Sequence, residues 1–263
     1  GVVVYYIFVG KINLFFIVFC ALLFMSCSQK ESSNDSFQPK PDELVYFKKN
    51  LDTESLPDEW VNEFHTIFAH LELVIPVYKT NFDTIHLYAW KGKKAHKSEE
   101  PFPGIEGGAY IGGDNNEFIQ FVTEIPPDEF TNDDKHRYAV IVHEYFHTYQ
   151  MSLSSNFGSP EKFRVKWMSE GAATVIESIY VDQKYETNYI VNHKAPHNLE
   201  TKNKFRNSLK EPQNQESYDE EDSNYNVSVF FTLMLSKEIQ DKKGVSESEA
   251  LRKILRDFYL LNP

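Results

Sequence analysis

The chain has 263 residues, a length that suits one principal domain better than two. Hydrophobic residues make up 41% of it, and with the 11 glycines this is an ordinary globular composition, so a fibrous or wholly disordered chain is excluded. The formal net charge is -12, and a protein with this field repels phosphate backbones, so we expect no nucleic acid partner. The 2 cysteines are too few for a disulfide scaffold.

The N-terminal segment is typical of an export signal. Residues 12–25 are apolar, follow the positive charge of Lys11, and end at Ser26 and Cys27, where a polar run begins. The pattern resembles a bacterial lipoprotein signal over residues 1–27, which implies cleavage before Cys27 and lipidation of its thiol. An uncleaved transmembrane anchor is the alternative, because this stretch is long enough to span a bilayer. Both interpretations place the remaining chain outside the cytoplasmic membrane, and the first predicts a lipid anchor in the bacterial cell envelope, at the outer membrane.

A tether and a helix come next. Residues 28–42 are rich in Ser, Pro and charged side chains, which predicts a flexible tether before a domain over residues 43–263. Residues 55–72 are expected to form the first helix, with Ser55 as its N-cap. Its apolar residues recur at helical spacing and predict a core-facing stripe of Trp60, Phe64, Ile67, Phe68 and Leu71.

The next part of the chain predicts strands over residues 82–90, 108–111 and 118–124. Mostly helices are expected after residue 128. A helix, several strands and then helices predict an α+β fold, with a small N-terminal helix and strand lobe followed by a mainly helical lobe.

The C-terminal third begins with an acidic run over residues 216–224, which lacks ordered calcium-ligand spacing and is interpreted as a solvated loop. Two helices are predicted after it, over residues 225–240 and 246–261. Ser246 followed by Glu249 forms the pattern of a capping box at the start of the second.

The segment with the clearest chemistry is His143-Glu144-Tyr145-Phe146-His147, an HExxH pattern. On a helix, residues four apart lie on the same face, so both imidazoles can reach one metal ion. Glu144 then stands where it can approach a water molecule at the metal. The alternative is a core helix that carries two hydrogen-bonded histidines.

A third ligand would distinguish these interpretations, because a catalytic zinc takes three protein ligands. A metzincin places Gly and His three and six residues after the second histidine, but this chain has Gln150 and Leu153 there, so that class is excluded. Glu170 follows His147 after 22 intervening residues, and residues 154–160 form a helix-ending turn between them. Two antiparallel helices would bring Glu170 against the histidine pair.

The segment around Glu170 resembles the gluzincin zinc peptidases, whose aminopeptidase-N-like branch carries Trp-x-x-Glu-Gly-x-Ala-Ser/Thr. The matching positions are Trp167, Glu170, Gly171, Ala173 and Thr174. The resemblance covers about residues 139–178, and its longer ligand spacing places the chain in the wider superfamily. It implies a zinc ion bound by His143, His147 and Glu170. It also implies that Glu144 is the general base in the hydrolysis of peptide bonds.

The same resemblance implies supporting residues. A tyrosine or histidine from a later helix often stabilises the oxyanion, and Tyr225 is the candidate by position, followed by His193 and His197; a core tyrosine is the alternative for Tyr225. Thr174 and Glu177 share the predicted helix of Glu170 and are expected to hydrogen-bond the ligating histidines, although Glu177 is equally compatible with a surface charge.

A substrate-binding strand is also expected. In this superfamily an edge strand before the active-site helix pairs with the substrate backbone, and residues 107–120 are the candidate. The sequence therefore predicts a membrane-anchored, extracytoplasmic zinc metallopeptidase that acts on peptides or proteins. A non-catalytic envelope binding module and a zinc hydrolase of a non-peptide amide are the alternatives. The sequence indicates no oligomeric state.

Overall fold

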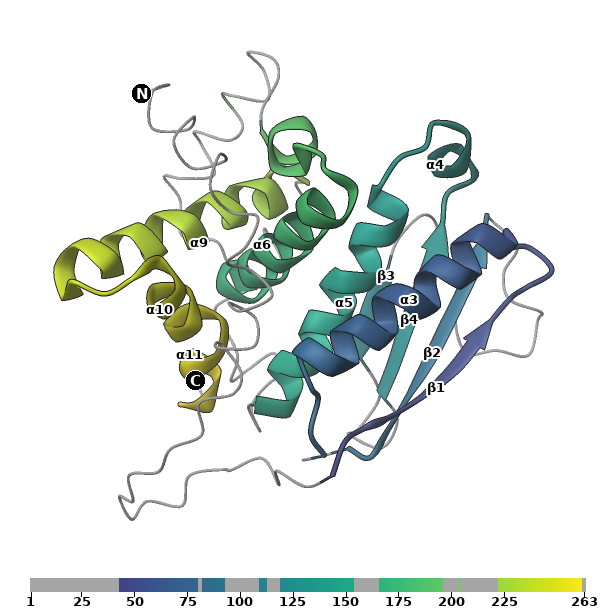
Figure 1. The fold of residues 1–263 in the computed structure, drawn as a ribbon, viewed down its shortest axis with the longest axis horizontal. Helices are drawn as coiled ribbons and strands as arrows, with labels where there is room; N and C mark the ends of the chain where they lie inside the picture. The colour runs from purple at the N-terminus through teal and green to yellow at the C-terminus, as the bar shows by residue number, and fades with distance from the viewer. Residues whose placement is uncertain are drawn as a thin grey trace.

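The computed structural model is a mixed α and β structure in which helices outnumber strands (Figure 1). The residues that it describes are 43–79, 82–92, 109–112, 119–153, 166–195, 203 and 222–261. The predicted signal, Cys27 and the tether lie outside these residues. None of the helices in the described part of the chain is long and apolar enough to cross a membrane.

A four-stranded sheet forms the N-terminal side, in the order β1-β2-β4-β3. Strands β1 (Tyr46–Leu51), β2 (Thr84–Lys91) and β4 (Ile119–Ile125) are parallel. Strand β3 (Ala109–Gly112) is antiparallel to β4 and forms an edge of the sheet. The three predicted strands are confirmed with small changes in their bounds, whereas β1 was not predicted.

The first helix is α3, Asp58–Val74, and the five residues of its predicted apolar stripe are all buried. The prediction of Ser55 as the N-cap is wrong, because Pro57 occupies that position. The Ser55 hydroxyl instead accepts a hydrogen bond from the Lys91 backbone N–H at 3.0 Å and donates to the Asp52 carbonyl at 3.2 Å. Ser55 therefore ties the entry of the helix to the end of β2.

Helices α3 and α5 (His136–Leu153) cover one face of the sheet (Figure 1). Aromatic rings join β1, α3 and α5: the Phe47 and Phe68 centroids are 4.9 Å apart, and the Tyr145 centroid lies 5.2 Å from that of Phe68. The Tyr145 hydroxyl donates to the Ile75 carbonyl at 2.8 Å. This packing fixes the helix that carries the HExxH residues against the sheet.

The other side of the molecule is helical (Figure 1). The short helix α4 (Pro127–Thr131) precedes α5, and α6 (Lys166–Tyr185) packs beside it. A π-helical turn, η1 (Ile190–Lys194), follows α6, and α9 (Asp222–Lys243) packs along α6. The predicted α+β class is therefore confirmed.

The C-terminal segment folds as α10 (Glu247–Arg252), the π-helical turn η2 (Lys253–Asp257) and the final turn α11 (Phe258–Leu260). The predicted cap is confirmed, because the Ser246 hydroxyl accepts a hydrogen bond from the Glu249 backbone N–H at 3.2 Å. The single predicted helix is thus interrupted by one π-helical turn.

Gly171 lies at a close approach of α6 and α9. A Cβ atom at this position would lie 2.3 Å from the Thr232 hydroxyl and 2.4 Å from the Ser228 carbonyl oxygen. Beside this contact, the rings of Trp167 and Phe231 pack with their centroids 5.6 Å apart. The Trp and Gly of the segment around Glu170 therefore serve the contact between the two helices.

Candidate metal centre

The centre lies between α5 and α6. His143 of α5 contacts Glu177, in the second half of α6. Gln150, near the end of α5, contacts Ser169, near the start of α6. The two helices therefore run antiparallel. The residues between these two contacts face one another across the helix pair, which is the arrangement that the sequence predicts for Glu170.

Three side chains converge there. His143 Nε2 and His147 Nε2 are 3.1 Å apart, and Glu170 Oε2 lies 3.2 Å from the former and 3.3 Å from the latter. These residues form the group that can hold a metal ion in the described part of the chain. The predicted ligand set is thus brought together in space.

The donor triangle has the size that a tetrahedral ion requires. Metal–ligand bonds of about 2.0–2.1 Å in a tetrahedron separate the ligand atoms by roughly 3.3 Å, close to the three observed distances. Two imidazoles and one carboxylate also form the donor set of many catalytic zinc sites. The residues therefore fit a divalent metal ion bound by three protein ligands.

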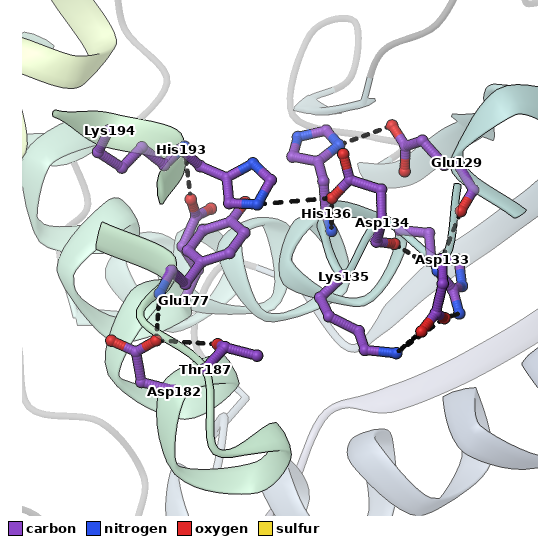
Figure 2. A network of polar contacts seen from close by, with 12 residues as sticks. Glu129, Asp133, Asp134, Lys135, His136, Glu177, Asp182, Thr187, His193 and Lys194 are labelled. Carbon is purple, nitrogen blue, oxygen red and sulfur yellow. Dashed lines mark hydrogen bonds and ion pairs between the residues drawn. The ribbon is translucent and has the colours of Figure 1, made fainter. Parts of the chain in front are cut away.

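The other ring nitrogen of His143 is held by a charged pair. Its Nδ1 lies 2.7 Å from Glu177 Oε2, and the second oxygen of Glu177 lies 2.9 Å from Lys194 Nζ on η1 (Figure 2). Burial raises the pKa of Glu177, but Lys194 and His143 outweigh this effect and hold it at about 2. Glu177 therefore contacts His143, as the sequence predicts, and it is 3% exposed, so the surface-charge alternative is wrong.

The other ring nitrogen of His147 has a neutral partner. Its Nδ1 lies 2.7 Å from Gln150 Oε1, within the fully buried interior of the helix pair. Gln150 was not predicted to belong to the site. Its position three residues after His147 on a helix was the available signal, since such residues share a face.

The electrostatics of the centre favour a cation. Burial lowers the pKa of His143, but Glu177 and Glu170 raise it to about 10. Burial raises the pKa of Glu170, but the two histidines outweigh this effect and bring the pKa far below its usual value. When a metal replaces the protons on the two imidazoles, the carboxylates of Glu144, Glu170 and Glu177 and the ammonium group of Lys194 leave two negative charges. A divalent ion would balance them.

Glu144 lies in the wall of a cavity of about 380 Å³ that His143 also lines. It is only 6% exposed, and its Oε2 has no hydrogen-bond partner among the described residues. Burial raises the pKa of this carboxyl group. The arrangement leaves one carboxylate oxygen beside the ligand cluster, where it can take up a proton.

The cavity collects side chains from several elements. Tyr225, from α9, and Thr174, from α6, both line it, so two further predicted residues lie close to the HExxH helix. The hydrogen bonds to the ligating histidines described above come from Glu177 and Gln150, and Thr174 contributes to the cavity wall. The full lining is Glu124, Ile125, Pro126, Glu129, His136, Val140, His143, Glu144, Thr174, Glu177, Lys194, Tyr225 and Asn226.

Of the two other candidates for the oxyanion donor, His193 does not line this cavity. His193 stacks on Tyr189 with ring centroids 4.5 Å apart, and its Nε2 lies 3.8 Å from Asp134 Oδ1 (Figure 2). It therefore ties η1 to the residues that precede α5. His197 lies outside the described residues.

Five polar residues of the cavity wall were not predicted as site residues, among them Glu124, Glu129 and His136. His136 Nδ1 lies 2.8 Å from Glu129 Oε1 (Figure 2), and this contact raises the pKa of His136 although burial lowers it. No motif marks these residues, because strand β4, helix α4 and the start of α5 meet only in the folded chain. Of the predicted substrate-binding segment over residues 107–120, Ala109–Gly112 form the edge strand β3 beside β4, residues 119–120 belong to β4, and the others lie outside the described residues.

Comparison of the chain with protein families, curated proteins and solved structures finds no match. The support for the candidate metal centre is therefore the arrangement of His143, His147 and Glu170.

Proposed function

We propose that the protein is a zinc-dependent metallopeptidase of gluzincin type that hydrolyses peptide bonds outside the cytoplasm, with a lipid on Cys27 as its anchor at the bacterial outer membrane. The observation that carries this proposal is the buried Glu144 carboxylate beside the His143, His147 and Glu170 triangle. Lipidation and location rest on the signal-like sequence alone.

The chemistry follows from the roles that these side chains can take. A zinc ion, when bound, polarises a scissile carbonyl and lowers the pKa of water towards 7. Glu144 takes a proton from the attacking water and passes it to the leaving amine, and burial, which raises the pKa of this carboxyl group, favours the uptake of the proton. Tyr225, in the same cavity wall, is the proposed hydrogen-bond donor to the oxyanion.

The state of Glu144 favours an enzyme over a binding module. A buried carboxylate oxygen without a hydrogen-bond partner costs stability, so a protein that only binds its ligand gains nothing by keeping it. A general base needs such an oxygen. The same argument applies to a hydrolase of non-peptide amides, so an activity assay must distinguish peptide substrates from non-peptide amides.

The test compares the full chain in detergent with its Glu144→Gln variant. We expect about one zinc per chain in both by elemental analysis, and cleavage of a peptide library by the unchanged chain alone, followed by mass spectrometry. Glu63→Gln is the matched control, since Glu63 pairs with Lys184 at 3.2 Å on another part of the molecule. Full activity of Glu144→Gln would overturn the mechanism.

Two other outcomes separate the alternatives. Zinc without peptide cleavage, together with hydrolysis of cell-wall amides, would indicate the non-peptide hydrolase. Zinc with no hydrolysis of either substrate class would indicate the binding module.

A further inference from the structure

Gln150 makes four hydrogen bonds in the interior of the molecule. Its Oε1 lies 2.7 Å from His147 Nδ1 and 3.2 Å from the Ser169 hydroxyl, which donates to it. Its Nε2 donates to the Ser169 carbonyl at 3.1 Å and to the Tyr259 hydroxyl at 2.8 Å. Both donors and both lone pairs of the amide are thus in use.

These partners determine which way the amide faces. The Ser169 carbonyl can only accept, so the amide nitrogen must face it and the amide oxygen must face His147. An amide oxygen can only accept, so His147 Nδ1 must carry the proton. The lone pair of His147 is therefore on Nε2, which faces His143 and Glu170.

Tyr259 stabilises this orientation from the C-terminal end of the chain. It lies on α11, is fully buried, donates its hydroxyl proton to the Met168 carbonyl at 3.3 Å, and accepts a hydrogen bond from Gln150 at its oxygen. Burial raises the pKa of Tyr259, so the hydroxyl keeps its proton. A flipped Gln150 would bring two acceptors together at Ser169 and leave Tyr259 without this donor.

The same hydrogen bonds reach the third ligand. Met168 and Ser169 directly precede Glu170 in the first turn of α6, and their carbonyls accept from Tyr259 and Gln150. The position of this turn against α5 decides where the Glu170 carboxylate lies. Gln150 and Tyr259 thus act on two of the three ligands at once.

We propose that Tyr259 is a positioning residue of the metal centre, which acts through Gln150 to hold His147 in its metal-binding tautomer and to place Glu170. The C-terminal segment is then a part of the metal site, although it supplies no ligand. This inference rests on the metal-binding part of the proposed function, and it does not depend on the substrate or on catalysis.

The test measures metal affinity directly. Zinc dissociation constants of the full chain, Tyr259→Phe and Gln150→Met are determined by competition with a chromophoric chelator, and the visible absorption of the cobalt-substituted proteins is recorded. Partners of metal-bound histidines typically contribute tenfold to hundredfold in affinity. We expect a loss in this range for Gln150→Met, a smaller one of about fivefold to tenfold for Tyr259→Phe, and altered cobalt spectra for both.

Tyr145→Phe is the matched control. It also removes a buried tyrosine hydroxyl that donates to a backbone carbonyl, and it lies on the HExxH helix, but its hydroxyl faces Ile75 and no ligand. We expect a similar fall in melting temperature with an unchanged zinc affinity. The double variant that combines Tyr259→Phe with Gln150→Met should bind zinc about as weakly as Gln150→Met alone, because Tyr259 acts through Gln150.

The outcomes are distinguishable. Unchanged zinc affinity and cobalt spectrum in a folded Tyr259→Phe protein would overturn this inference while leaving the metal site in place. Independent, fully additive losses would also overturn it, since they would separate Tyr259 from Gln150. No zinc or cobalt in the unchanged chain would overturn both this inference and the proposed function.

Discussion

The two histidines of the metal centre are supported from opposite sides by partners of different kinds. His143 is held by the charged pair of Glu177 and Lys194, at the cavity wall, where Lys194 keeps 14% of its side chain exposed. His147 contacts Gln150, which in turn donates to Tyr259, and both of these partners are neutral and fully buried. A charge is thus used where a counter-ion lies within reach, and an amide is used in the interior.

The difference follows from the cost of desolvation. An unpaired carboxylate in the interior loses its hydration and costs several kcal/mol, so a glutamate at position 150 would need a cation beside it. The amide supplies the same acceptor for His147 Nδ1 and also a donor for the Ser169 carbonyl. Both sides thus orient the ring of their histidine, one through a charged pair and the other through a neutral amide.

The largest effect on zinc affinity is expected for a change of Glu170. Glu170 contacts both histidines, so Glu170→Ala removes a ligand rather than a support. We expect zinc affinity to fall by more than about a hundredfold, the upper end of what the loss of a supporting partner costs. Elemental analysis after dialysis checks this, with Glu72→Ala, which removes the surface pair with Lys49, as the control. Full zinc occupancy in Glu170→Ala would exclude Glu170 from the ligand set.

The parts of this centre that were predictable from sequence are those set by local spacing. His143 and His147 share a face because they are four residues apart on a helix, and Glu170 follows on the next helix. Glu177 lies two turns beyond Glu170, so its place near the histidines also follows from helical geometry. These positions need only the two helices and their antiparallel contact.

The remaining parts depend on contacts between distant segments. Tyr259 is 109 residues from Gln150, and Lys194 lies on a π-helical turn that no periodicity marks. Strand β1 was missed because Lys48 and Lys49 interrupt its apolar pattern. The prediction of Ser55 as an N-cap was wrong because the Ser55 hydroxyl instead accepts a hydrogen bond from the Lys91 backbone N–H at the end of β2.

The next largest effect concerns acid stability, which separates the charged side from the neutral one. The pKa of Glu177 is held at about 2 in the folded chain, below the ordinary value of 4.5. A depressed pKa stabilises the folded chain above pH 4.5, and this stabilisation is lost as the pH falls towards 2. The free energy of unfolding therefore falls as the pH is lowered. In chelator-treated protein we expect Glu177→Gln to reduce the slope of this fall by up to about 1.4 kcal/mol per pH unit.

Urea unfolding between pH 5 and pH 3 provides the measurement. His143, with its pKa raised to about 10, stays protonated throughout this range and adds no slope of its own. Gln150→Met is the matched comparison, because an amide does not titrate and the acid slope should stay that of the unchanged chain. Equal slopes in all three proteins would show that the Glu177 pair does not distinguish the two sides.

The smallest effect is expected for Lys194→Met, which leaves Glu177 bonded to His143 but removes its counter-ion. Because Lys194 is partly exposed, water replaces some of the lost interaction, so we expect zinc affinity to fall only about threefold to tenfold. Lys184→Met, which breaks the pair with Glu63 elsewhere on α6, should leave it unchanged, and Lys194→Arg should restore most of it. With a cleaved peptide as substrate, an action through Glu177 predicts a lower kcat at constant KM. A higher KM with unchanged zinc affinity would instead mean that Lys194 binds the substrate from the cavity wall, and the charged side would then serve recognition rather than the metal.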